Sequence, residues 1–169
     1  MAYAFWIGSS PIITKTNSGI MTEVSFYHLQ RKPLTEALPK LLERVRAADL
    51  KAVVLAGSKE RIEALDAALW AYDPDSFLAH GTRRTGFPED QPIYLTTDEE
   101  KPNGATVLVT VDGVQPGFVG DFDRCLDMFD GNDDASVEAA RERWKAYKAA
   151  GFDVTYWQQS PEGRWEKKG

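Results

Sequence analysis

The fold class is indicated by one short stretch of the chain, Ala52-Val53-Val54-Leu55-Ala56-Gly57-Ser58. Its first five residues are all apolar, which is typical of a strand buried on both faces of a parallel sheet. Ser58 is a favourable N-cap residue, so a helix is expected to begin directly after it. A buried strand that leads at once into a helix is the repeating unit of α/β proteins.

Strands and helices alternate on both sides of this stretch. The alternation predicts a single α/β domain of three-layer, Rossmann-like architecture, with a mainly parallel or mixed sheet and helices on both faces. Residues 79–90, rich in Gly, Thr and Arg, are expected to form a loop. The expected strands are 23–28, 52–56, 92–95 and 106–111; the expected helices are 34–48, 59–72 and 133–150; 118–129 is helical or extended; and 152–158 pairs with 163–167 as a hairpin.

The first twenty residues differ in character from the rest. Residues 3–7 are apolar but too few for a signal peptide, and the segments 8–11 and 17–19 are rich in Gly, Ser, Asn and Pro. We therefore expect residues 1–20 to be a flexible N-terminal extension and residues 21–169 to form the domain.

Charge is distributed unevenly along the chain. The whole sequence has 20 basic and 26 acidic residues, whereas residues 135–169 have seven basic and five acidic ones. An acidic protein is repelled by DNA phosphates, while a basic C-terminal end suits the capture of an acidic peptide. The single cysteine, Cys125, allows no internal disulfide, so a reducing cytoplasm is the expected compartment.

The fingerprints of nucleotide and metal chemistry are missing. A phosphate-binding P-loop needs Lys followed by Ser or Thr, but here Ser58 precedes Lys59, and Ala52 stands where the loop needs its first glycine. A nucleotide-binding Rossmann-like enzyme therefore remains only an alternative. His28, His80 and one cysteine are too few for a clustered metal site, so no metal or cofactor is expected. We interpret His80 as a structural histidine because no nucleophile motif accompanies it.

The expected last helix carries a basic and aromatic stripe. Arg141, Trp144, Lys145 and Lys148 are spaced i, i+3, i+4 and i+7, so they share one face. Cations around a large aromatic ring suit an anionic ligand that also has an apolar part. The alternative is a solvated helix face whose tryptophan packs into the core.

Three segments of the chain carry a family resemblance. They are Phe26-Tyr27-His28-Leu29; Ala68-Leu69-Trp70 with Asp75-Ser76-Phe77-Leu78-Ala79-His80; and residues 141–152. In this order, and over roughly residues 21–157, they resemble the chi subunit of the bacterial DNA polymerase III holoenzyme. The resemblance implies a non-catalytic accessory subunit of DNA replication, located at the replisome in the cytoplasm. It also implies an adaptor that links the clamp loader, through the psi subunit, to the acidic C-terminal tail of the single-stranded-DNA-binding protein.

The resemblance also assigns residues to these two partners. Arg141, Trp144 and Lys145 correspond to the site for the tail, and Phe129 aligns with an apolar pocket position. Trp144 stands where the family often has tyrosine. Lys148 is added from helical spacing.

Trp70 and Phe77 resemble a protein-contact surface for psi or for a competing helicase. The alternative for these two residues is that both cover the core. A further hypothesis is direct binding of single-stranded DNA, with Trp70, Trp144, Tyr147 and Trp157 as stacking platforms. The negative net charge disfavours it, so contact with DNA is expected to be mainly indirect.

Overall fold

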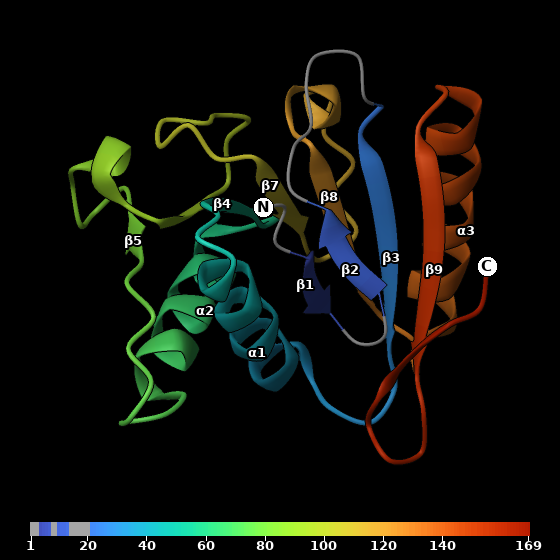
Figure 1. Cartoon of the computed structure of the whole chain (residues 1–169), viewed down its shortest axis with the longest axis horizontal. Helices are drawn as coiled ribbons and strands as arrows, with labels where there is room; N and C mark the ends of the chain where they lie inside the picture. The colour runs from blue at the N-terminus through green and yellow to red at the C-terminus, as the bar shows by residue number, and fades with distance from the viewer. Residues whose placement is uncertain (1–3, 8–9, 14–20) are drawn as a thin grey trace.

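The computed structural model describes residues 4–7, 10–13 and 21–169 of the chain. Its centre is an eight-stranded sheet in the order β10-β9-β3-β8-β7-β4-β6-β5 (Figure 1). All neighbouring strands of this sheet are parallel except β9 and β10. The strands are β3 (Glu23–Leu29), β4 (Ala52–Leu55), β5 (Gly81–Thr82), β6 (Ile93–Thr96), β7 (Val107–Thr110), β8 (Arg124–Asp130), β9 (Asp153–Gln159) and β10 (Trp165–Lys167).

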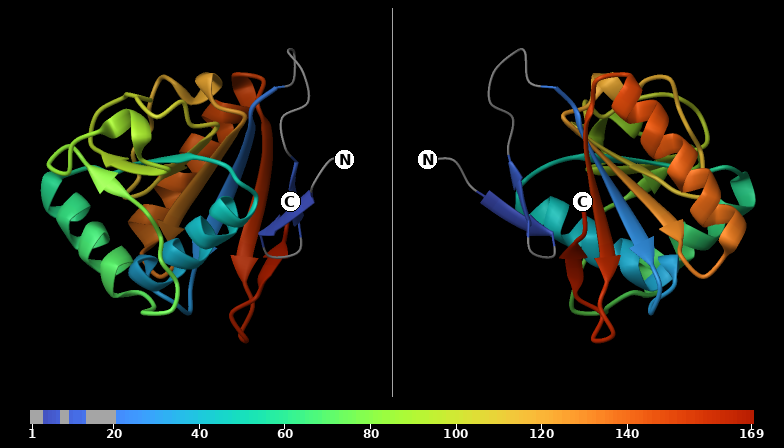
Figure 2. Two further views of the ribbon diagram at one scale, coloured as in Figure 1. Left: turned by 60° about the vertical axis from the view of Figure 1, so that its left-hand side comes forward. Right: turned by 90° about the vertical axis from the view of Figure 1, so that its right-hand side faces the viewer.

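Three helices cover the two faces of the sheet (Figures 1 and 2). Helices α1 (Leu34–Ala47) and α2 (Lys59–Ala71) lie on one face, and α3 (Asp134–Ala149) lies on the other. A separate apolar core fills each side, with the α1 and α2 side chains in one and the α3 side chains in the other. The predicted three-layer α/β domain is thereby confirmed.

Local signals account for the ends of these helices. The Ser58 side chain accepts a hydrogen bond from the Arg61 amide and caps α2, as predicted. Asp133 caps α3 in the same way through the Ser136 amide. Gly151, at φ +91°, follows the end of α3, in a conformation that only glycine adopts at no steric cost.

The structure defines the secondary structure of two segments, residues 118–129 and residues 79–90. The segment expected to be helical or extended contains a short 3-10 turn, η2 (Val119–Asp121), followed by the long strand β8. The expected loop at 79–90 contains β5 and a second 3-10 turn, η1 (Pro88–Asp90). A strand of two residues leaves no readable alternation in the sequence, which is why β5 was not predicted.

Two short strands precede the eight-stranded sheet in the sequence, β1 (Ala4–Ile7) and β2 (Ser10–Ile13), and they pair with each other in antiparallel fashion. The backbone of β1 lies beside α1, in the same layer of the molecule (Figures 1 and 2). The remainder of residues 1–20 lies outside the described residues. The flexible extension therefore stays a prediction. Among the helices that the structure describes, none has the length and apolar character needed to cross a lipid bilayer.

Candidate functional site

The predicted basic and aromatic stripe lies on α3, and we call it the α3 stripe (Arg141, Trp144, Lys145 and Lys148). The three cations are exposed, whereas Trp144 is half-buried and packs against the core beneath α3. The Lys148 Nζ atom lies 4.4 Å from the centroid of the Trp144 ring, within range of a cation–π contact. The structure thus combines both interpretations of the stripe, because the ring contacts the core and borders the cations.

Two acidic residues that the sequence analysis left out partly neutralise the α3 stripe. Arg141 Nη1 lies 3.7 Å from Glu138 Oε2, and Lys145 Nζ lies 3.3 Å from Glu142 Oε1. All four side chains are well exposed, so these pairs add little to stability. An incoming carboxylate has only to displace weak, solvated partners.

Phe129 lies at the end of β8 and is buried. The rings of Phe26, His28 and Tyr156 surround it at centroid distances of 6.4, 5.0 and 6.4 Å. Of the residues predicted for the tail site, it offers the least surface to a ligand. Its contact with a bound tail stays a prediction.

Sequence reasoning missed Tyr156, which borders the same region. It lies on β9 and packs against the core under α3, and its hydroxyl is hydrogen-bonded to His28 Nδ1. Burial raises the pKa of Tyr156, and the nearby positive charge of Arg141 opposes that rise. The sequence pattern of β9 could have indicated this position. Side chains alternate along a strand, so Tyr156 faces the core under α3 while its neighbour Trp157 faces the core on the other side of the sheet.

Arg143, inside the same basic run, is not a surface cation. Its side chain is 4% exposed and binds Asp127, which is 2% exposed, through two hydrogen bonds of 2.7 and 3.0 Å. Burial raises the pKa of Asp127, while the Arg143 guanidinium opposes that rise. This ion pair fixes α3 on β8, and so sets the direction in which the α3 stripe points.

A second surface lies on α2 and the segment after it, and we call it the α2 patch (Trp70 and Phe77). The side chains are 62% and 76% exposed, and their ring centroids are 6.1 Å apart. These exposures contradict the alternative in which both residues cover the core. Exposed aromatic pairs of this kind are typical anchors of protein–protein contacts.

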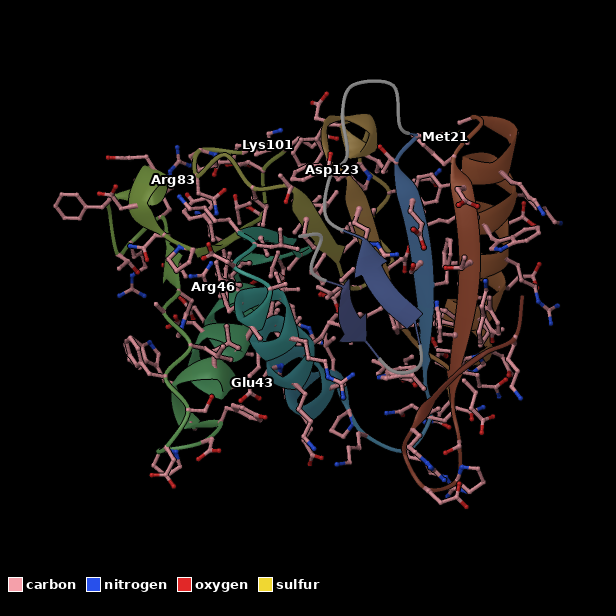
Figure 3. The ribbon with its side chains drawn as sticks, in the orientation of Figure 1. Met21, Glu43, Arg46, Arg83, Lys101 and Asp123 are labelled. Atoms are coloured by element: carbon pink, nitrogen blue, oxygen red, sulfur yellow. The ribbon has the colours of Figure 1, made fainter. Side chains whose placement is uncertain are left out.

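Glu43 on α1, which is labelled in Figure 3, holds the turn between the two aromatic residues of the α2 patch. Its carboxylate accepts hydrogen bonds from the Tyr72 hydroxyl at 2.9 Å and from Ser76 Oγ at 3.1 Å. Burial, reinforced by the bond to Glu43, raises the pKa of Tyr72 to about 12. The turn therefore has a fixed connection to the body of the domain.

The carboxyl ends of β3 and β8 border a crevice of about 820 Å³, where α1 and α3 depart to opposite faces. In α/β proteins such a crevice is the usual ligand position. Here three successive backbone amides, those of Gln30, Arg31 and Lys32, donate to the Gln159 Oε1 atom at 3.1, 3.0 and 3.4 Å. The chain's own side chain thus occupies the amides that could otherwise hold a phosphate, which weakens the nucleotide alternative.

The alternative of direct binding to single-stranded DNA also loses support in the described part of the chain. Tyr147 and Trp157 are buried, so neither can stack on a base. No group of three potential metal ligands occurs among the described residues. Cys125 is buried, and burial raises the pKa of its thiol, which makes it unreactive.

Comparisons with known proteins identify the family of the chain. Residues 21–155 match the family model described as DNA polymerase III chi subunit, HolC. A probable DNA polymerase III subunit chi from Rickettsia prowazekii (strain Madrid E) is 31% identical over 99 residues, covering 59% of this chain and 60% of that protein.

Two further relatives are aligned over nearly their whole length. The DNA polymerase III subunit chi of Escherichia coli (strain K12) is 27% identical over 79% of this chain and 96% of its own. That of Pseudomonas aeruginosa (strain PAO1) is 23% identical over 79% of this chain and 94% of its own. Because the family model spans most of the domain, the chain belongs to the DNA polymerase III chi subunit family and has its place in DNA replication.

Proposed function

We propose that this chi-family subunit is a non-catalytic adaptor of the replisome in the cytoplasm. The α2 patch binds the psi subunit of the clamp loader, and the α3 stripe binds the acidic C-terminal tail of the single-stranded-DNA-binding protein. The observation that carries the proposal is the placement of the two surfaces. They belong to helices on opposite faces of the sheet, so two partners can be held at once (Figure 2).

The chemistry of the α3 stripe suits a peptide that ends in an apolar residue. Arg141 and Lys145 supply exposed cations for the terminal carboxylate and for nearby acids. The partly exposed Trp144 ring supplies an apolar surface beside them. Charge-assisted hydrogen bonds give this contact direction, and its exposure makes it sensitive to salt.

Replacing Arg141 with alanine is expected to weaken tail binding roughly tenfold to a hundredfold, because a charge-assisted hydrogen bond contributes about 1.5–3 kcal/mol. The measurement is calorimetric titration with a short acidic peptide ending in Asp-Ile-Pro-Phe. The same peptide with an amidated C-terminus should bind poorly to the parent protein. The matched control is Arg84→Ala, since Arg84 is also an exposed arginine paired with a glutamate, its Nη1 lying 3.6 Å from Glu63 Oε1. Equal binding by the Arg141 variant and the parent would refute this assignment.

Replacing Trp70 with alanine is expected to weaken psi binding about thirtyfold, as truncation of a central aromatic anchor costs about 2 kcal/mol. Binding is measured by calorimetry with the purified psi subunit from the same organism. Phe87→Ala serves as the control, because Phe87 is similarly exposed (71%) but lies outside the α2 patch. If the Trp70 variant binds psi normally yet no longer binds a replication helicase, the patch belongs to the helicase.

A further inference from the structure

The exposed ring of Trp70 rests on a buried histidine. The His80 imidazole centroid lies 4.9 Å from the Trp70 ring centroid, with an angle of 55° between the planes. The His80 side chain has no solvent exposure, although the indole above it is largely exposed. The Trp70 ring therefore packs against His80, a residue that no partner protein can contact.

The two nitrogens of His80 face groups that only accept hydrogen bonds. Nδ1 lies 2.7 Å from the carbonyl oxygen of Leu78, and Nε2 lies 2.9 Å from Oδ1 of Asp66. A neutral imidazole has a single N–H and can donate to only one of them. Both bonds form together when the ring is an imidazolium and Asp66, whose side chain is 35% exposed, is ionised. With His80 in that doubly bonded form, its ring would present a cation to the indole of Trp70.

Asp66 and Trp70 are spaced i, i+4 on α2, so they lie on the same face of that helix. His80 comes from the far end of the segment that follows the helix. Together with Glu43, which holds Tyr72 and Ser76, the Asp66–His80 pair fixes this segment at both ends. The α2 patch is therefore built as a preorganised surface, which lowers the entropic cost of binding.

We infer that the Asp66–His80 pair is a positioning element for the α2 patch, and that the positive charge of His80 orients Trp70 for its protein partner. This role rests on the proposed function, because it is measured as the affinity of the chain for psi. Asp66 and His80 do not themselves touch psi. They act through the Trp70 ring.

The variant that tests the charge is Asp66→Asn. The asparagine keeps the size of the side chain and can still hydrogen-bond to Nε2, but a neutral partner no longer favours the imidazolium. Psi binding is expected to weaken about threefold to tenfold, in line with the strength of a cation–π contact. Asp66→Glu, which keeps the charge, is expected to recover part of the loss. The matched control is Glu63→Gln, an acid-to-amide change one turn earlier on α2 that leaves His80 untouched.

A double-mutant cycle separates positioning from general destabilisation. In a Trp70→Ala background, Asp66→Asn should have no further effect on psi binding, because the ring through which it acts is gone.

The fluorescence of Trp70 gives a second test that does not require psi. Protonated imidazole quenches indole emission more strongly than neutral imidazole, so the Trp70 contribution, obtained by subtracting the spectrum of a Trp70→Phe variant, should brighten in Asp66→Asn.

The outcomes distinguish this inference from the proposed function. If the parent binds psi and Trp70→Ala does not, but Asp66→Asn binds like the parent, the positioning role is wrong and the adaptor function stands. The role is also wrong if Asp66→Asn loses the same factor in both backgrounds. If the parent fails to bind psi, the proposed function fails and the role with it, whatever the emission of Trp70.

Discussion

Replacing Arg143 with methionine is expected to lower the free energy of unfolding by about 3–5 kcal/mol, the largest effect that we expect of any single change. The substitution keeps a long side chain, so little packing is lost. It leaves the Asp127 carboxylate buried at 2% exposure without its two hydrogen bonds from the guanidinium. Denaturant unfolding followed by circular dichroism measures the difference.

The control removes both charges at once. In Arg143→Met combined with Asp127→Leu no charge remains buried, so most of the lost stability should return. The pH dependence gives a second check. Without Arg143, burial holds the pKa of Asp127 above its value in the unfolded chain, so the folded variant binds the proton more tightly. The Arg143→Met variant should therefore recover stability relative to the parent as the pH falls toward the pKa that Asp127 has in the unfolded chain. A constant deficit at all pH values would contradict this account.

Gly131 is a position where the addition of a single methyl group should be strongly destabilising. It follows β8, where its amide donates to the Leu29 carbonyl at 2.7 Å and its carbonyl faces His28 Nε2 at 3.3 Å. A Cβ atom at this position would overlap the His28 imidazole and lie only 2.7 Å from the Leu29 carbonyl oxygen. His28 is bonded to Tyr156 and packed against Phe129, so it would have to break these contacts to move aside.

We expect Gly131→Ala to lower the free energy of unfolding by about 3 kcal/mol, at the upper end of the usual cost of overpacking. Thermal or denaturant unfolding is the measurement. Gly57→Ala is the matched control: a Cβ there would meet its nearest atoms at 3.7 Å, an ordinary contact, and Gly57 has no positive φ. If Gly131→Ala and Gly57→Ala are equally stable, His28 moves aside more easily than its contacts indicate. The steric explanation would then be wrong.

Features encoded by neighbouring residues were predictable from the sequence. The apolar run of β4, the Ser58 cap of α2 and the Gly151 end of α3 each depend on a few adjacent residues, and all lie where they were expected. The α3 stripe was also predictable, because helical spacing alone places its members on one face.

Features that depend on distant residues could not be predicted in the same way. Arg143 falls on the inner face of α3 with Ala140 and Tyr147, but its burial makes sense only once Asp127 lies beneath that helix. The Asp66–His80 pair likewise forms because the segment after α2 folds back along it. The interpretation of His80 as a structural histidine agrees with its two hydrogen bonds. The contact between His80 and Trp70 has no counterpart in any local sequence pattern.

The order of the strands has a consequence for synthesis on the ribosome. β3 is the first strand of the sheet to be made, but its two neighbours are β8 and β9, which are made more than ninety residues later. Among the strands made in between, β4 pairs with both β6 and β7, so these three can assemble as soon as they emerge. A nascent chain that ends before Arg124 therefore has both edges of β3 unpaired, together with the apolar side chains of that strand. Such edges invite pairing with other chains, so β3 is the strand most open to wrong association until β8 and β9 have been made.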